Sequence, residues 1–159
     1  MSAIFKLCLQ LFVVCLLVEV SCSTESEKLT YYVQLVRGSN DAEPPETRST
    51  AIGPKLAANL RSVFSWTNYW EIAREEVSLA SGQKTRVRLA NQREVEIDLT
   101  EKGKRIVVAY SGGNAVTRIT RPIGQSMTVV GGDRDKETAW FIIVRRDKPP
   151  KYDPGQAHR

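Results

Sequence analysis

Apolar and polar residues alternate on both sides of a short polar stretch between Lys84 and Thr100. A period of two is typical of a β-strand with one buried face, so this region predicts a hairpin that turns at residues 91–93. The predicted buried face consists of Val87, Leu89, Val95, Ile97 and Leu99. The other face is basic on the first strand and acidic on the second, with Lys84, Arg86 and Arg88 followed by Glu94, Glu96 and Asp98.

The position of the turn predicts the register of this hairpin. Val87 is expected opposite Ile97 on the buried face, and Arg86 opposite Asp98 on the outer face. A shift by one residue would turn the apolar face outward and is excluded. A shift by two residues pairs unlike charges equally well, so the charges alone leave the register open.

Similar short apolar runs predict further strands along the chain, at residues 29–37, 105–110, 115–121, 125–130 and 138–145. The runs at 105–110 and 138–145 are apolar on both sides, which is typical of central strands. The run at 115–121 is more polar and is expected near an edge. Turn-forming residues separate the runs, with an exposed loop expected at 38–53 and turns at 111–114 and 131–137.

One amphipathic helix is predicted between Pro54 and Trp66. Proline suits the first helical position, and helical spacing gives an apolar stripe of Leu56, Leu60, Val63 and Phe64. The stripe is expected to cover one face of the sheet. For residues 67–79 the pattern changes phase near Glu75 and Glu76, which favours a strand with a bulge. A short helix that continues the first one is the alternative.

These elements predict an α+β domain, made mostly of an antiparallel β-sheet of about seven or eight strands with one packed amphipathic helix. The expected domain is single and spans residues 24–146. Residues 147–159 contain several prolines and are expected to form an extended C-terminal tail.

Residues 1–23 have the pattern of an export signal. A single lysine precedes an apolar run, and small residues follow it, with a cleavage position near Ser23. Attachment of a lipid to Cys22 is one alternative, although Glu19 stands where lipoprotein signals usually carry an aliphatic residue. A retained N-terminal anchor is another. We therefore expect a periplasmic or secreted protein, with no transmembrane segment in the mature chain.

The positions of the cysteines indicate how the mature domain is stabilised, and the net charge indicates which classes of partner it could bind. Cys8, Cys15 and Cys22 all lie in or beside the export signal, so the mature domain would have no disulfide and depends on its core. The formal net charge is +5 and the pI is about 9.2, which suits weak binding to anionic envelope polymers. Envelope proteins are the other expected partners. Nucleic acid is not expected, because the protein is exported and no basic run is interleaved with stacking aromatics.

The residue types argue against catalysis. His158, close to the C-terminus, is the only histidine, so a histidine-based triad is almost excluded. We expect no catalytic residue, no cofactor and no metal site. Glu75 and Glu76 are interpreted as surface charges, because neighbours on a strand point to opposite faces. The acids of residues 133–137 alternate with bases and are interpreted as a solvated turn in preference to a calcium site.

Three aromatic residues follow the predicted helix: Trp66, Tyr69 and Trp70. Core packing is the simpler interpretation. An exposed aromatic platform for a glycan or a peptide is the alternative, and the three residues are therefore the candidate binding surface.

The strand Tyr31–Arg37, the stretch Gly53–Leu56 with the three aromatics, and the stretch Val130–Asp135 with Trp140–Ile142 resemble small exported bacterial proteins of unknown function, associated with Verrucomicrobia. That resemblance implies no activity. Residues 124–132, followed by 141–144, are locally similar to the late β region of secretins, the outer-membrane pores of secretion and pilus systems. The chain is much shorter than a secretin and lacks the periplasmic modules that precede this region.

The sequence therefore predicts a non-catalytic exported domain that binds or assembles with other envelope components. One alternative is an accessory component of a secretin-type secretion or pilus apparatus. A carboxylate-dependent hydrolase of cell-wall polymers, using Glu75, Glu76 or Asp133, is the other.

Overall fold

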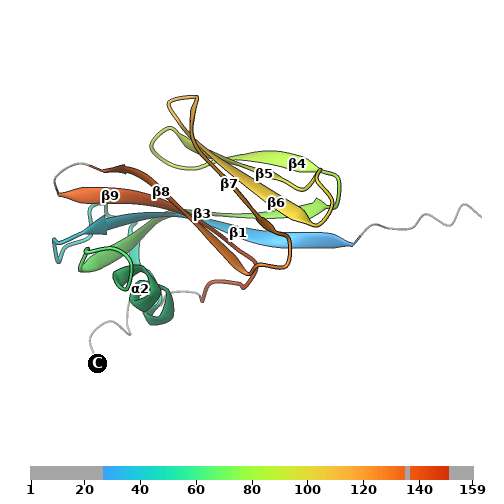
Figure 1. The fold of residues 1–159 in the computed structure, drawn as a ribbon. Coiled ribbons are helices and arrows are strands. Elements are labelled where there is room, and N and C mark those ends of the chain that lie inside the picture. The colour runs from blue at the N-terminus through green and yellow to red at the C-terminus, as the bar shows by residue number, and fades with distance from the viewer. Residues whose placement is uncertain (1–26, 135–136, 151–159) are drawn as a thin grey trace, which may run out of the picture.

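The computed structural model describes residues 27–134 and 137–150, and over these residues the chain folds into two antiparallel sheets and one helix (Figure 1). The order of the five-stranded sheet is β2-β3-β1-β9-β8, and that of the four-stranded sheet is β4-β5-β6-β7. The bounds are β1 Lys28–Ser39, β2 Thr50–Ala51, α2 Pro54–Arg61, β3 Asn68–Ala80, β4 Lys84–Arg88, β5 Arg93–Asp98, β6 Lys104–Ser111, β7 Asn114–Pro122, β8 Met127–Arg134 and β9 Thr138–Arg145.

The five-stranded sheet is the middle of three layers, because the four-stranded sheet packs on one of its faces and α2 on the other (Figure 1). Alternate side chains of β1 point to opposite faces of the five-stranded sheet. Tyr31, Val33 and Leu35 join the core between the sheets, whereas Val36 joins the core beneath the helix. The class expected from the sequence, mostly antiparallel sheet with one helix, is thus confirmed, although the strands are more numerous and the helix is shorter than expected.

The central hairpin forms as predicted, but its register is shifted by two residues from the expected one. Val87 lies opposite Val95, and Arg86 lies opposite Glu96. The reason is the turn, in which Asn91 and Gln92 both take positive φ angles of 58° and 55°. A turn with two such residues is tight and starts the second strand at once. The charges tolerate both registers, as expected, so the turn geometry decides between them.

The helix begins at Pro54 as predicted and ends earlier, at Arg61. Leu56 and Leu60 are buried, but Val63 is 73% exposed, so its predicted place on the apolar stripe is wrong. The N–H groups of residues 63 and 64 both point at the Leu60 carbonyl, which tightens the last turn and stops the helix. This turn directs Phe64 onto Phe141, with 4.6 Å between the ring centroids.

Residues 68–80 form strand β3, so the alternative of a second helix is wrong. The bulge predicted for this strand exists, but it lies at Ile72, opposite the junction of Leu35 and Val36. The first part of β3 also pairs with the two-residue strand β2, which lies inside the segment expected to be a loop. Two residues are too few to produce a sequence period, so this strand left no signal.

Strand positions within the sheets agree with the sequence. The apolar strands β6 and β9 each lie between two neighbours, and the polar strand β7 is an edge. After β9 the chain turns back under the five-stranded sheet, where Pro149 is buried. The expected export signal, residues 1–23, and the end of the expected tail, residues 151–159, lie outside the described residues.

Candidate functional site: a cationic cleft beside the helix

The three aromatic candidates do not share one surface. Tyr69 and Trp70 are neighbours on β3 and therefore point to opposite sides of the sheet. Tyr69 is only 3% exposed and packs beneath the helix, where burial raises the pKa of its hydroxyl and Arg61 acts in the opposite direction. Trp66 lies against Gly38 and Phe141. Tyr69 and Trp66 therefore pack into the core on the helix side of the sheet, whereas Trp70 is half-buried on the opposite face.

The carboxylates considered for catalysis are also apart. Glu75 and Glu76 are exposed on opposite faces of β3, in agreement with their interpretation as surface charges. The side chain of Asp133 lies outside the described residues. Among the residues that the structure describes, no three histidine, cysteine or acidic side chains group together in a way that could hold a metal ion.

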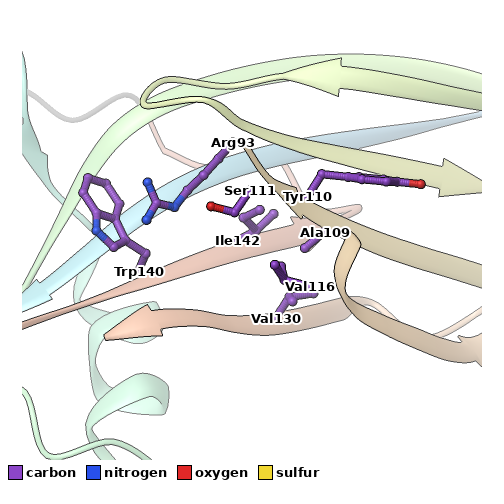
Figure 2. A pocket seen from close by; sticks show the side chains of 8 residues that line it. All are labelled: Arg93, Ala109, Tyr110, Ser111, Val116, Val130, Trp140 and Ile142. Atoms are coloured by element: carbon purple, nitrogen blue, oxygen red, sulfur yellow. The ribbon is translucent and has the colours of Figure 1, made fainter. Parts of the chain in front are cut away.

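A small gap between the two sheets lies beneath Arg93 and Trp140 (Figure 2). The Arg93 guanidinium lies over the Trp140 ring, with its carbon 4.3 Å from the ring centroid, and Arg37 approaches the same ring at 5.7 Å. The gap has a volume of about 10 Å³, which is close to the minimum for a single water molecule. We interpret it as a packing defect at the rim of the core.

A larger cleft lies on the helix side of the five-stranded sheet and has a volume of about 670 Å³. One wall is the segment that runs from β2 into the first turn of α2, and the opposite wall is the chain after β9. Its floor is the sheet itself. The lining residues are Gln34, Ala51, Ile52, Gly53, Pro54, Lys55, Leu56, Arg74, Arg145, Asp147, Lys148, Pro149 and Pro150. This volume falls within the range of small-ligand sites.

Two arginines on the floor of the cleft are already paired. Arg74 donates to both carboxylate oxygens of Glu71, at 2.8 and 2.9 Å. Arg145 donates in the same forked manner to Asp147. The hydrogen bonds from Arg145 lower the pKa of the Asp147 carboxyl, while its partial burial opposes that shift and the more distant Lys55 adds to it.

Lys55 and Lys148 supply the excess positive charge of the cleft. Within the part of the chain that the structure describes, neither ammonium group takes part in an ion pair. Because each arginine has its own acid, these two charges remain to attract an anion.

Gln34 is the unusual polar residue of the cleft, because it is only 2% exposed and its amide is half satisfied. Its Nε2 donates to Glu71, and a carboxylate can only accept, so this contact fixes the orientation of the amide. The Oε1 atom then has no hydrogen-bond partner among the described residues. A buried acceptor without a partner is costly, which marks this position for a donor from outside the protein.

The first turn of α2 adds further donors. Gly53 occupies the N-cap position without a side-chain hydrogen bond, and no acidic residue is present in the first turn. The first helical hydrogen bond runs from the Ala57 N–H to the Gly53 carbonyl, 3.0 Å apart. The N–H groups of Lys55 and Leu56 therefore have no acceptor inside the helix. They add to the positive potential at this end of the cleft.

Comparison with known protein families, curated proteins and solved structures finds no match for this chain. No helix in the two described ranges is long and apolar enough to span a membrane. The function is therefore inferred from the geometry of the cleft.

The sequence did not reveal this cleft. Its residues come from β1, β3, the start of α2 and the segment after β9, which are far apart along the chain. Pro54 and Leu56 belong to the predicted helix and Arg145 ends the last predicted strand, and neither pattern indicates a cleft. The one signal present is the proline-containing stretch 147–150, which predicts the start of an extended tail but forms a wall of the cleft in the structure.

Proposed function

We propose that the protein is an exported, non-catalytic domain that binds an anionic group of another envelope component through the cleft beside α2. The observation that carries this proposal is the two ammonium groups of Lys55 and Lys148, which have no ion-pair partner in residues 27–134 and 137–150, beside a helix terminus without a side-chain cap. Helix N-termini and lysines are both common anion ligands. Export rests on the pattern of residues 1–23.

The proposal is tested by recovering partners after crosslinking in cells, followed by purification from the envelope. The informative variant carries Lys55→Gln and Lys148→Gln, which remove the excess charge at exposed positions. The matched control carries Lys84→Gln and Lys102→Gln, which remove the same charge from the four-stranded sheet side of the molecule. We expect partners to be lost with the first variant and kept with the control. Equal recovery from both variants would contradict the proposed site.

Export is tested separately by mass spectrometry of the protein from the envelope fraction. We expect a chain that begins near Ser23. A mass that includes a lipid on Cys22 would support the anchored alternative, and an intact N-terminus would support a retained segment. A protein that stays in the cytoplasm would contradict the proposal.

The two alternative functions predict different results. An accessory component of a secretin-type apparatus predicts that pore or pilus proteins are recovered and survive washing at high salt. A hydrolase predicts turnover of cell-wall polymers that is lost in Glu75→Gln, Glu76→Gln or Asp133→Asn. Recovery only at low salt, together with an anionic polymer, would indicate a weaker electrostatic binder.

A further inference from the structure

We propose that the ligand of the cleft is the C-terminal end of a polypeptide, bound through its terminal carboxylate. This inference rests on the proposed function and names the chemical class of its ligand. In this arrangement the carboxylate meets the first turn of α2 and the ammonium groups of Lys55 and Lys148. The last peptide N–H of the ligand donates to Oε1 of Gln34.

The requirement for a donor distinguishes a peptide end from a simple anion. Gln34 lines the same cleft as the two lysines, and its buried Oε1 has no hydrogen-bond partner in the part of the chain that the structure describes. A sulfate dianion brings no hydrogen to donate and would leave this oxygen unsatisfied. A C-terminal residue carries a carboxylate and an amide N–H on the same Cα atom, so one short group can meet both demands.

The apolar part of the cleft supplies the third point of contact. Ile52 and Leu56 contribute buried aliphatic side chains next to the helix terminus, and Pro149 stands on the opposite wall. An anionic polysaccharide offers hydroxyl donors but no apolar branch for this surface. The last side chain of a polypeptide provides that branch, so we expect a preference for an aliphatic terminal residue. Capture of a terminal carboxylate by backbone N–H groups is a recurring mode of peptide recognition.

The test uses the full-length protein labelled with ¹⁵N and three probes: acetyl-Gly-Ala-Leu with a free carboxylate, the same peptide as its C-terminal amide, and sulfate. We expect the free acid to shift the backbone signals of Lys55 and Leu56 and the side-chain amide signal of Gln34. The amide-capped peptide is expected to bind roughly tenfold more weakly, because it lacks the charge-assisted hydrogen bonds. Sulfate is expected to shift the helix signals and to leave the Gln34 signal in place.

Titration of the Lys55→Gln, Lys148→Gln variant, with Lys84→Gln, Lys102→Gln as the control, locates the binding. Equal binding of the free acid and the amide would overturn the peptide-end inference. If sulfate or an anionic polymer still bound in a manner that depends on Lys55 and Lys148, the proposed function would stand without the peptide-end inference. If no probe gave shifts that depend on these lysines, both would fall. The comparison of acid with amide needs no substitution, so misfolding of a variant cannot obscure it.

Discussion

Gly38 lies directly beneath the indole ring of Trp66. A Cβ atom at Gly38 would stand 2.8 Å from Cδ1 of that indole and 3.0 Å from Phe141. Real Cβ atoms do not approach other atoms so closely, so only a residue without a side chain allows the ring to reach the sheet. The contact explains why Trp66, which the sequence offered as part of a binding surface, packs against the domain.

Substitution of Gly38 by alanine is therefore expected to destabilise the domain by about 1–3 kcal/mol, the usual cost of overpacking a well-filled core. Urea unfolding followed by tryptophan fluorescence measures this change. Gly124→Ala is the matched control, because no atom lies within 4 Å of the corresponding Cβ position, and its effect should stay within about 0.5 kcal/mol. Equal stability of the two variants would show that the indole is displaced without cost.

The register of the central hairpin can be tested by crosslinking, in a chain whose three native cysteines are replaced by serine. Arg86 and Glu96 are direct cross-strand neighbours, so Arg86→Cys with Glu96→Cys should form a disulfide readily on mild oxidation. Arg86→Cys with Asp98→Cys represents the register expected from the sequence. In the structure that pair is diagonal, about 7–8 Å apart, and should remain largely reduced. Faster closure of the second pair would contradict the structural register.

This hairpin shows how far the sequence determined the fold. Alternation identified both strands and the buried face, because each residue on the wrong face would lose apolar burial. The register depended on a turn in which Asn91 and Gln92 take positive φ, and the sequence has no glycine at these positions to indicate such a turn. The end of α2 was also not predictable from the apolar pattern. Val63 continues the apolar stripe in sequence, but the helix ends before it, at Arg61.

The candidate site was less predictable than the fold, because none of its residues has a distinctive sequence pattern by itself and the cleft forms only when distant segments come together. A lone glutamine such as Gln34 reads as an ordinary strand residue, and Glu71 and Arg74 read as surface charges. The β-bulge at Ile72 changes which side Glu71 takes relative to Ala73 and brings its carboxylate beside Gln34. Neither the bulge position nor the return of the chain after β9 has a local signature, so the cleft appears only in three dimensions.

The turn after β5 is expected to make stability depend on pH. Asp98 accepts hydrogen bonds from the hydroxyl and the N–H of Thr100, at 2.6 and 2.8 Å. These bonds lower the pKa of the Asp98 carboxyl; desolvation opposes the shift slightly, and Lys84 and Arg118 add to it. The folded-state pKa thus lies below the unfolded value of about 4. The resulting stabilisation is complete above that value and is lost as the pH falls through the folded pKa.

Asp98→Asn keeps the accepting oxygen and removes the charge, which isolates this effect. We expect the wild type to exceed the variant in free energy of unfolding near about pH 6, and the difference to shrink toward about pH 2.5. Urea unfolding at several pH values measures it. A difference that does not change with pH would mean that the charge of Asp98 contributes nothing and that the hydrogen bonds alone hold the turn.

Arg105 is the largest fully buried side chain of the domain, with 0% exposure. It lies on β6 and points between the sheets, where its Nη2 donates to the Thr128 hydroxyl at 2.7 Å and its guanidinium lies 5.3 Å from the Tyr31 ring centroid. Its Nε and Nη1 atoms have no hydrogen-bond partner among the described residues. Desolvation by burial is the main cause that lowers the pKa of Arg105, and the nearby Arg146 adds to it, whereas Tyr31 opposes it.

This arrangement leaves a buried charge with one hydrogen bond and one aromatic face to offset its loss of hydration. Replacement of buried charged groups by apolar residues of similar volume is often neutral or stabilising. We therefore expect Arg105→Met to raise the free energy of unfolding by about 1 kcal/mol or more. Arg105→Lys should lower it, because an ammonium is more strongly hydrated and covers less of the Tyr31 ring. Thermal and urea unfolding of the two variants measure these changes in stability. A methionine variant less stable than the wild type would show that the contacts with Tyr31 and Thr128 outweigh the desolvation of the guanidinium.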